Sequence, residues 1–316
     1  MKKLPQWHEV EIILSEIDDQ LRADGYEIPQ RPMNAVCRVS DRFHIPLPLV
    51  AKPLSGTDDN ADAETLVARI YEWYSARYGD RLKLNPAPRS FALMLCGEPW
   101  RVRLPLMLAG VVVTAIRNPK VKSTESGIGR FDGKSKLLNL FDLVEDLPLT
   151  IRCQCSDEEQ SSLEFLFHVA FELSNTLHWI EKVGMVASAI GDLESAVDKF
   201  FQQPKDLGGS RWASLQFVEK LLKSFVIVSG GKPGKKGHRL IEYAKQAEAH
   251  GLPSHPRKLY DAVQCDASVR YREVRVTLAE AIRAHHEALR LGCAVAKAIA
   301  VVADNSGVLP RRPIRA

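Results

Sequence analysis

The sequence contains no long hydrophobic run. Its 316 residues include no stretch of about eighteen apolar side chains, and the longest candidate, Leu104 to Ile116, is interrupted by Pro105 and Gly110. The first residues, Met1 to Pro5, lead into polar positions without the apolar core of a signal peptide. These absences predict a cytoplasmic protein that does not contact membranes.

Cysteine is also sparse. The six cysteines are scattered along the chain, so no disulfide framework is expected, and a reducing compartment suits them. Cys153 and Cys155 stand one residue apart, but no second cysteine pair follows at zinc-finger spacing. The sequence therefore predicts no metal site and no cofactor.

The common catalytic signatures are missing as well. No G-x-S-x-G motif marks an activated serine. The loop Gly230 to Gly237 lacks the Lys-Ser/Thr pair and the spacing of a P-loop, so it is expected to be a glycine cap followed by a basic turn. His285 and His286 are adjacent on an expected helix and point about 100° apart, so they cannot share one metal ion unaided.

Charge is present but unevenly distributed. Residues 1–200 hold 23 Lys and Arg against 29 Asp and Glu, whereas residues 201–316 hold 20 against 10. The basic part predicts contact with RNA or another polyanion, and the acidic part predicts a protein partner or a sensed signal. The alternative is that the two parts neutralise each other across an internal interface.

Hydrophobic spacing predicts a mostly helical chain. Ser156-x-x-Glu159 and Thr277-x-x-Glu280 fit capping boxes that open two of the helices. The expected helices cover residues 8–24, 32–43, 63–78, 137–146, 157–184, 185–203, 210–228, 238–250 and 277–303.

Strand patterns are confined to one region. Residues 90–96, 100–104 and 110–116 predict a three-stranded antiparallel meander with Val112 facing the core. The fold class is therefore α+β, mostly α. We expect a mixed domain over residues 1–183 and a helical bundle over residues 184–316, which ends in the basic tail Pro310 to Arg315 and folds alone.

The C-terminal third resembles the HEPN superfamily of helical-bundle domains. Ala213 to Lys223 is similar to the A-x-x-x-x-E-K-x-L-K pattern of the second family helix, and Gly237 to Tyr243 stands where the next helix begins with a histidine. Arg270-Tyr271 and Val276 to Ala281 resemble the start of the final family helix. The resemblance covers about residues 187–303 and implies a bundle that often dimerises.

Active HEPN ribonucleases carry R-x(4–6)-H, and that spacing is absent here. The resemblance therefore favours a non-enzymatic binding or regulatory protein that contacts RNA or another polyanion, in a prokaryotic defence or toxin–antitoxin setting. The basic residues expected to make this contact are Lys232, Lys235, Lys236, Arg239, Arg257, Lys258, Arg270, Arg272 and Arg275.

Two alternatives remain open. One is a metal-independent ribonuclease with a displaced Arg/His pair, whose candidate residues are His238, Arg270, Arg283, His285 and His286. The other is a structural subunit that forms a homodimer through its helical bundle.

Overall fold

The computed structural model describes residues 4–26, 28–48, 62–82, 89–105, 111–123, 136–234, 237–271 and 273–307. Most of these residues are helical, with four short strands, so the α+β, mostly α, class is confirmed. In the described ranges no helix is both long enough and apolar enough to cross a bilayer. The predicted basic tail lies outside them. The chain divides into two compact units, residues 1–86 and 87–316.

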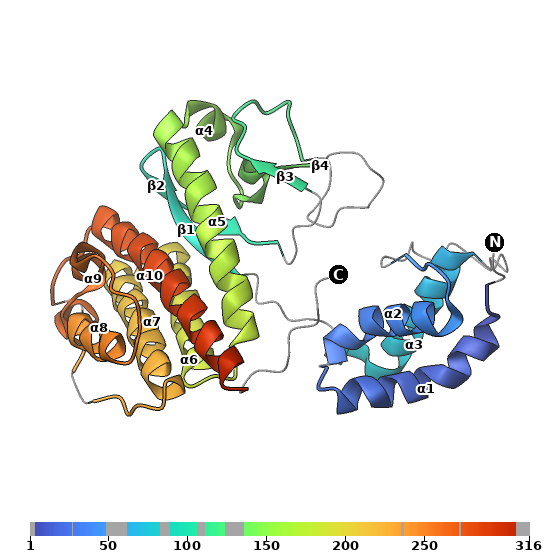
Figure 1. Ribbon diagram of the computed structural model, residues 1–316. Helices are drawn as coiled ribbons and strands as arrows, with labels where there is room; N and C mark the ends of the chain where they lie inside the picture. The colour runs from blue at the N-terminus through green and yellow to red at the C-terminus, as the bar shows by residue number, and fades with distance from the viewer. Residues whose placement is uncertain are drawn as a thin grey trace. The chain divides into compact units, whose positions relative to one another are not determined.

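The described residues of the first unit form three α-helices, α1 (Trp7–Ala23), α2 (Arg31–Phe43) and α3 (Ala63–Tyr78), together with the short 3₁₀ helices Ile28–Gln30 and Gly79–Leu82 (Figure 1). Each α-helix begins and ends within one residue of the bounds that the sequence predicts. Their apolar stripes form a separate core that includes Val10, Leu14, Val36, Ile70 and Tyr74. The unit therefore has an interior of its own.

The second unit holds all the described strands. β1 (Ser90–Leu95) and β2 (Glu98–Arg103) form an antiparallel hairpin, in which Leu95 pairs with Glu98. β3 (Val111–Thr114) instead pairs in parallel with β4 (Lys136–Asn139), which is followed by the 3₁₀ helix Leu140–Leu143. The three-stranded meander is therefore wrong beyond its first hairpin, and so is the helix expected over residues 137–146.

Val112 does not face the core. Its side chain is 55 % exposed, whereas its neighbour Val113 packs against the main core. Because side chains alternate along a strand, the parallel pairing with β4 turns Val112 outward. The predicted burial of Val112 was wrong.

Seven helices complete the second unit. They are α4 (Leu149–Gln154), α5 (Asp157–Trp179), α6 (Val186–Phe201), α7 (Leu207–Val228), α8 (Leu240–Ala249), α9 (Arg257–Val263) and α10 (Leu278–Asn305) (Figure 1). Both predicted capping boxes are present, at Ser156 and at Thr277. The short helix α9 was not expected from the sequence.

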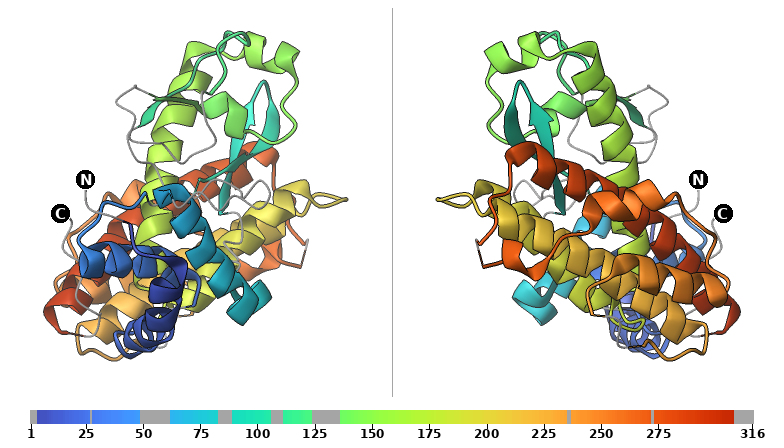
Figure 2. Two further views of the ribbon diagram at one scale, coloured as in Figure 1. Left: turned by 90° about the vertical axis from the view of Figure 1, so that its right-hand side faces the viewer. Right: turned by 90° about the vertical axis from the view of Figure 1, so that its left-hand side faces the viewer.

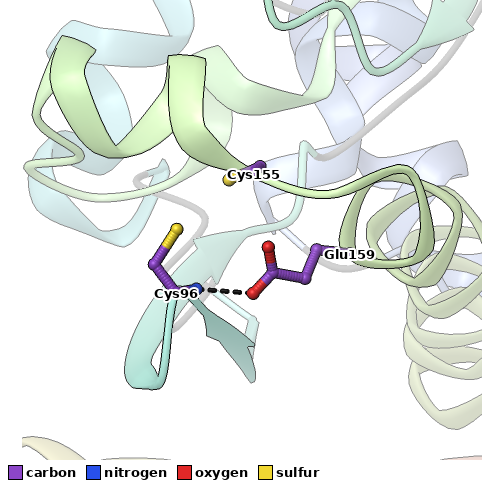
Figure 3. A group of neighbouring side chains, drawn as sticks. All are labelled: Cys96, Cys155 and Glu159. Atoms are coloured by element: carbon purple, nitrogen blue, oxygen red, sulfur yellow. Dashed lines mark hydrogen bonds between the residues drawn. The ribbon is translucent and has the colours of Figure 1, made fainter.

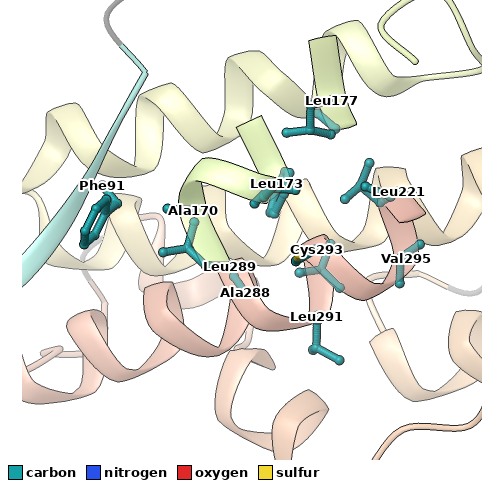
Figure 4. Close-up of a cluster of buried hydrophobic side chains, with 14 of the residues drawn as sticks. Phe91, Ala170, Leu173, Leu177, Leu221, Ala288, Leu289, Leu291, Cys293 and Val295 are labelled. Atoms are coloured by element: carbon teal, nitrogen blue, oxygen red, sulfur yellow. The ribbon is translucent and has the colours of Figure 1, made fainter. Parts of the chain in front are cut away.

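The core of the second unit is continuous from the hairpin to the last helix. Phe91 of β1, Leu173 of α5, Leu221 of α7 and Leu289 of α10 belong to one cluster of buried side chains (Figure 4). The hairpin lies beside α5 in two further views (Figure 2). The expected boundary between residues 183 and 184 thus falls inside this unit, because α5 and α10 bury their stripes against each other.

Helices α7 and α10 run in the same direction. Arg211 and Glu280, in the first turns of the two helices, approach to 4.0 Å, and farther along Phe217 meets Gly292. A Cβ atom added to Gly292 would lie 2.4 Å from the ring of Phe217. The absence of a side chain at Gly292 therefore sets how closely the two helices approach.

Candidate nucleic-acid interface

His285 and His286 are both bound to the backbone of one strand residue. The backbone N–H of Ala92 donates to His285 Nε2 at 3.2 Å, and His286 Nε2 donates to the carbonyl oxygen of Ala92 at 3.0 Å. Ala92 uses these groups on the edge of β1 that faces away from β2. The two histidines thus satisfy the backbone groups of Ala92 on the outer edge of the hairpin.

Burial keeps both imidazoles neutral. Desolvation, with a smaller contribution from His286, lowers the pKa of His285 to about 3. Desolvation lowers the pKa of His286 to about 4. Arg283 is exposed two residues before His285, about 200° around the helix axis. Arg283 therefore faces solvent while His285 faces the core, so the two side chains do not form a pair. The role of His285 and His286 is to bind the backbone of Ala92.

His238 has a different environment. Its Nδ1 lies 2.9 Å from Glu219 Oε2, and because a carboxylate only accepts, the imidazole donates. Glu219 is 3 % exposed and also accepts from Lys223. The side chain of His238 is 49 % exposed, and its ring meets the edge of Trp212 at 4.7 Å between centroids. A buried carboxylate thus orients a histidine that reaches solvent.

The predicted basic residues do not all lie together. Gln246 Nε2 binds the carbonyl oxygen of Lys232, and Gly231 N binds Val226 O, near the end of α7. Val269, beside Arg270, instead lies against Gly208 at the start of α7. The 18 residues from Gly208 to Val226 span roughly 27 Å of helix.

Three of the predicted residues lie outside the described residues: Lys235, Lys236 and Arg272. Arg257 and Lys258 begin α9 and are exposed, with Arg257 Nε 3.6 Å from Asp261. Lys232 is exposed as well. Burial and the nearby Glu248 carboxylate of α8 raise the pKa of Tyr260 on α9, and His250, just after α8, lies against Gly231 beyond the end of α7. Arg257, Lys258 and Lys232 therefore lie toward the end of α7, away from the basic residues at its start.

Four arginines and a tyrosine gather where α7, α8 and α10 begin. We call this group the arginine end: Arg211, Arg239, Arg270, Arg275 and Tyr271. Gln264 connects its parts. The carbonyl oxygen of Gln264 accepts from Arg211 Nη2 at 3.1 Å, its Nε2 donates to His238 O at 2.9 Å, and its Oε1 accepts from Leu240 N at 2.9 Å.

The arginine end is open to solvent. Arg239, Arg270 and Arg275 are exposed, and no ion pair among the described residues engages them. Tyr271 is 67 % exposed, with the Arg270 guanidinium 5.8 Å from its ring centroid. An exposed aromatic ring beside free guanidinium groups is the combination that stacks a base and holds its phosphate.

Acidic residues are also present at this end. Glu273 is exposed between Arg270 and Arg275, whereas Asp266 and Glu280 are engaged in helix caps. Asp266 accepts from Ser268 N, and Glu280 accepts from Thr277 N. These bonds lower the pKa of both carboxyl groups and keep them charged. The N-termini of three helices, which carry partial positive charge, point the same way. The end thus offers an anion both guanidinium groups and helix dipoles.

The sequence did not single out Arg211, Trp212 or Tyr271 for this role. Arg211 and Trp212 lie about 60 residues from Tyr271, and Gln264 and His238 bring their neighbourhoods together. An exposed Arg-Tyr dipeptide in a basic segment was the available signal. Residues 270–276 lie between two expected helices, so no periodicity in the sequence indicated that Tyr271 is exposed.

Comparison of the chain with protein-family models, with curated proteins and with solved structures finds no match. The resemblance of residues 187–303 to HEPN domains therefore stays a prediction.

Proposed function

We propose that this chain is a binding protein that contacts single-stranded RNA, or a similar polyanion, through the arginine end. The observation that carries the proposal is that Arg239, Arg270 and Arg275 are exposed just before α8 and α10 begin, with the Arg270 guanidinium beside the exposed ring of Tyr271. Guanidinium groups would pair with phosphates, and the ring of Tyr271 would stack on a base. Neither contact reads a base edge, so the expected binding has little sequence preference.

Salt dependence tests the phosphate contacts. Each single-strand phosphate contact contributes a slope of about −0.7 in log affinity against log salt. The three exposed arginines, Arg239, Arg270 and Arg275, therefore give a slope of about −2. Fluorescence anisotropy of a labelled 20-nucleotide RNA, titrated with the full chain across a salt series, measures this slope.

Paired double variants locate the contact. Arg270→Glu/Arg275→Glu removes two contacts, so the slope of log affinity against log salt should flatten by about 1.4. The affinity should fall by the same factor for every RNA sequence. Lys232→Glu/Lys258→Glu makes the same change in net charge elsewhere and should leave the slope unchanged. Equal losses of RNA affinity in the two double variants would show that only net charge matters. If the wild-type chain does not bind RNA even at low salt, RNA is not its ligand.

A second candidate function rests on His238. A histidine oriented by a buried carboxylate, near the arginines of the same end, is the arrangement of a general base beside a phosphate-binding group. This favours the metal-independent ribonuclease alternative with His238 rather than His285 or His286 as the histidine. Cleavage of labelled RNA in the presence of a chelator tests it. His238→Gln should abolish cleavage, whereas His178→Gln, at an exposed histidine on α5, should not.

A further inference from the structure

Two cysteines and a glutamate from three different elements converge at one end of α5. Cys96 lies in the turn between β1 and β2, Cys155 is the C-cap of α4, and Glu159 is in the first turn of α5. The two sulfur atoms and a carboxylate oxygen all lie within 4.8 Å of one another. Figure 3 shows the three side chains facing a common point. Because Cys96 and Cys155 are 59 positions apart, the spacing of the sequence gave no sign of this group.

The hairpin holds the Cys96 thiol in place at a conformational cost. Cys96 and Gly97 form a two-residue turn with φ values of 48° and 80°, a geometry that favours Asn-Gly. A cysteine in this left-handed conformation costs roughly 1 kcal/mol. The backbone N–H of Cys96 donates to Glu159 Oε1 at 2.5 Å, which fixes the turn against α5.

Glu159 is fixed from both sides and still has capacity to bind. Its Oε2 accepts from Ser156 N at 2.8 Å in the capping box, while Oε1 accepts from Cys96 N. Each carboxylate oxygen carries two lone pairs, so one on each remains for a further partner. The carboxylate is therefore oriented before any ligand arrives.

Cys155 is the buried member of the group. Its side chain is almost completely enclosed, with Sγ 3.3 Å from Ile151 O. Burial, together with the neighbouring Cys96, raises the pKa of the Cys155 thiol to about 12. Arg117 donates to the carbonyl oxygen of Cys155 at 2.7 Å and places one positive charge nearby.

We propose that Cys96, Cys155 and Glu159 bind one zinc ion, with a fourth position open to solvent on the Cys96 side. Two thiolates and a carboxylate are donors that Zn²⁺ accepts, with Zn–S distances of about 2.3 Å. A tetrahedral ion with such bonds holds its sulfur ligands about 3.8 Å apart, so the observed grouping needs to contract by about 1 Å at most. Binding releases the two thiol protons to the solvent, and no bond other than S–H breaks.

Proton release gives the site a measurable pH dependence. Below the pKa values of the free thiols, an ion that displaces two protons gains about 100-fold in affinity for each unit of pH. A site of carboxylates alone would not change in this way above pH 6. The slope of log affinity against pH therefore reports whether thiolates are the ligands.

Zinc titration of the reduced full chain, in competition with a chromophoric chelator, tests the proposal. We expect one ion per chain, together with the sulfur-to-metal absorption of a thiolate site when Co²⁺ replaces Zn²⁺. Cys96→Ser and Glu159→Gln should each weaken binding at least 10-fold. Cys153→Ser is the matched control, because Cys153 is exposed two residues from Cys155 and is not part of the group.

Two results would overturn the proposal. One is a reduced wild-type chain that takes up no zinc at micromolar concentrations. If air oxidation then joins Cys96 to Cys155, the pair is a redox-active dithiol rather than a metal site. The other is equal uptake by wild type, Cys96→Ser and Glu159→Gln. Circular dichroism melts of each variant confirm that the comparison is made between folded chains.

Discussion

His285 and His286 make stability depend on pH at the level of single side chains. Their pKa values in the fold, about 3 and about 4, lie below the ordinary value near 6.5 that applies in the unfolded chain. The unfolded chain therefore binds protons below pH 6.5 while the folded chain does not. The two neutral histidines therefore make their full contribution to the free energy of unfolding above pH 6.5. This contribution falls as the pH decreases toward 4, and at pH 5 the loss is about 2 kcal/mol per histidine.

Urea unfolding at a series of pH values between 4.5 and 7.5 measures this effect. His286→Gln keeps a donor for the carbonyl oxygen of Ala92 but does not titrate, so it should remove about half of the pH dependence. His178→Gln, at an exposed position, should leave it intact. An unchanged slope in His286→Gln would contradict the assignment.

Asp18 of α1 is a buried carboxylate in the first unit. It is fully enclosed, receives the hydroxyl of Tyr78, and lies 3.4 Å from Arg31 Nη1 and 3.7 Å from Arg77 Nε. Removing one charge from such a buried network leaves Arg31 without compensation. Asp18→Asn should therefore destabilise the unit by about 3–5 kcal/mol.

The neighbouring residue supplies the control. Asp19 is 66 % exposed and 3.7 Å from Arg22, so Asp19→Asn should cost at most about 1 kcal/mol. Tryptophan fluorescence follows the unfolding, since Trp7 and Trp73 lie in this unit. Comparable losses of unfolding free energy from Asp18→Asn and Asp19→Asn would show that the burial of Asp18 does not increase its contribution to stability.

Among the elements, the contact between α7 and α10 depends on one missing side chain. Gly292→Ala adds a methyl group 2.4 Å from the ring of Phe217, which is fully buried and cannot move aside. The overpacking cost of about 1–3 kcal/mol exceeds the helix propensity gained, about 1 kcal/mol. Gly292→Ala should therefore lower the melting temperature.

Gly191 of α6 is the matched case. A Cβ atom added there meets nothing within 4 Å, so Gly191→Ala keeps the propensity gain and should stabilise the chain by up to about 1 kcal/mol. Differential scanning calorimetry of the two variants gives opposite shifts if this account holds. A stabilised Gly292→Ala would mean that α7 and α10 separate at little cost.

Local patterns in the sequence were sufficient for the long helices. They were insufficient for the short helices α4 and α9, for residues 137–146, and for the pairings between distant segments. Helical periodicity and the caps at Ser156 and Thr277 act within a few residues, so they could be read directly. The parallel pairing of β3 with β4, and the binding of Ala92 by His285 and His286, join positions that no local rule connects. Arg239, Arg270 and Arg275 were expected from the sequence, but the addition of Arg211 and Tyr271 to them, and the group of Cys96, Cys155 and Glu159, were missed for the same reason.

For the whole molecule, the two units predict how the chain can be divided. Residues 87–316 contain one continuous core, so that fragment should melt cooperatively. A fragment of residues 184–316 lacks α5 and uncovers the stripe of α10 that α5 buries, so it should give a non-cooperative melt and weak near-ultraviolet circular dichroism. A sharp melt of the shorter fragment would instead support the boundary first expected from the sequence.

The position of α10 in the chain also bears on synthesis. The first unit is complete at Pro86, whereas α10, which packs against α5, α7, α9 and β1, begins only at Leu278. At about 5–20 residues per second, roughly 10–40 s separate the two on the ribosome. During that interval the first unit can close its core, while α5 and α7 wait with their apolar faces uncovered. We therefore expect aggregation during synthesis to arise from the unfinished second unit rather than from the first.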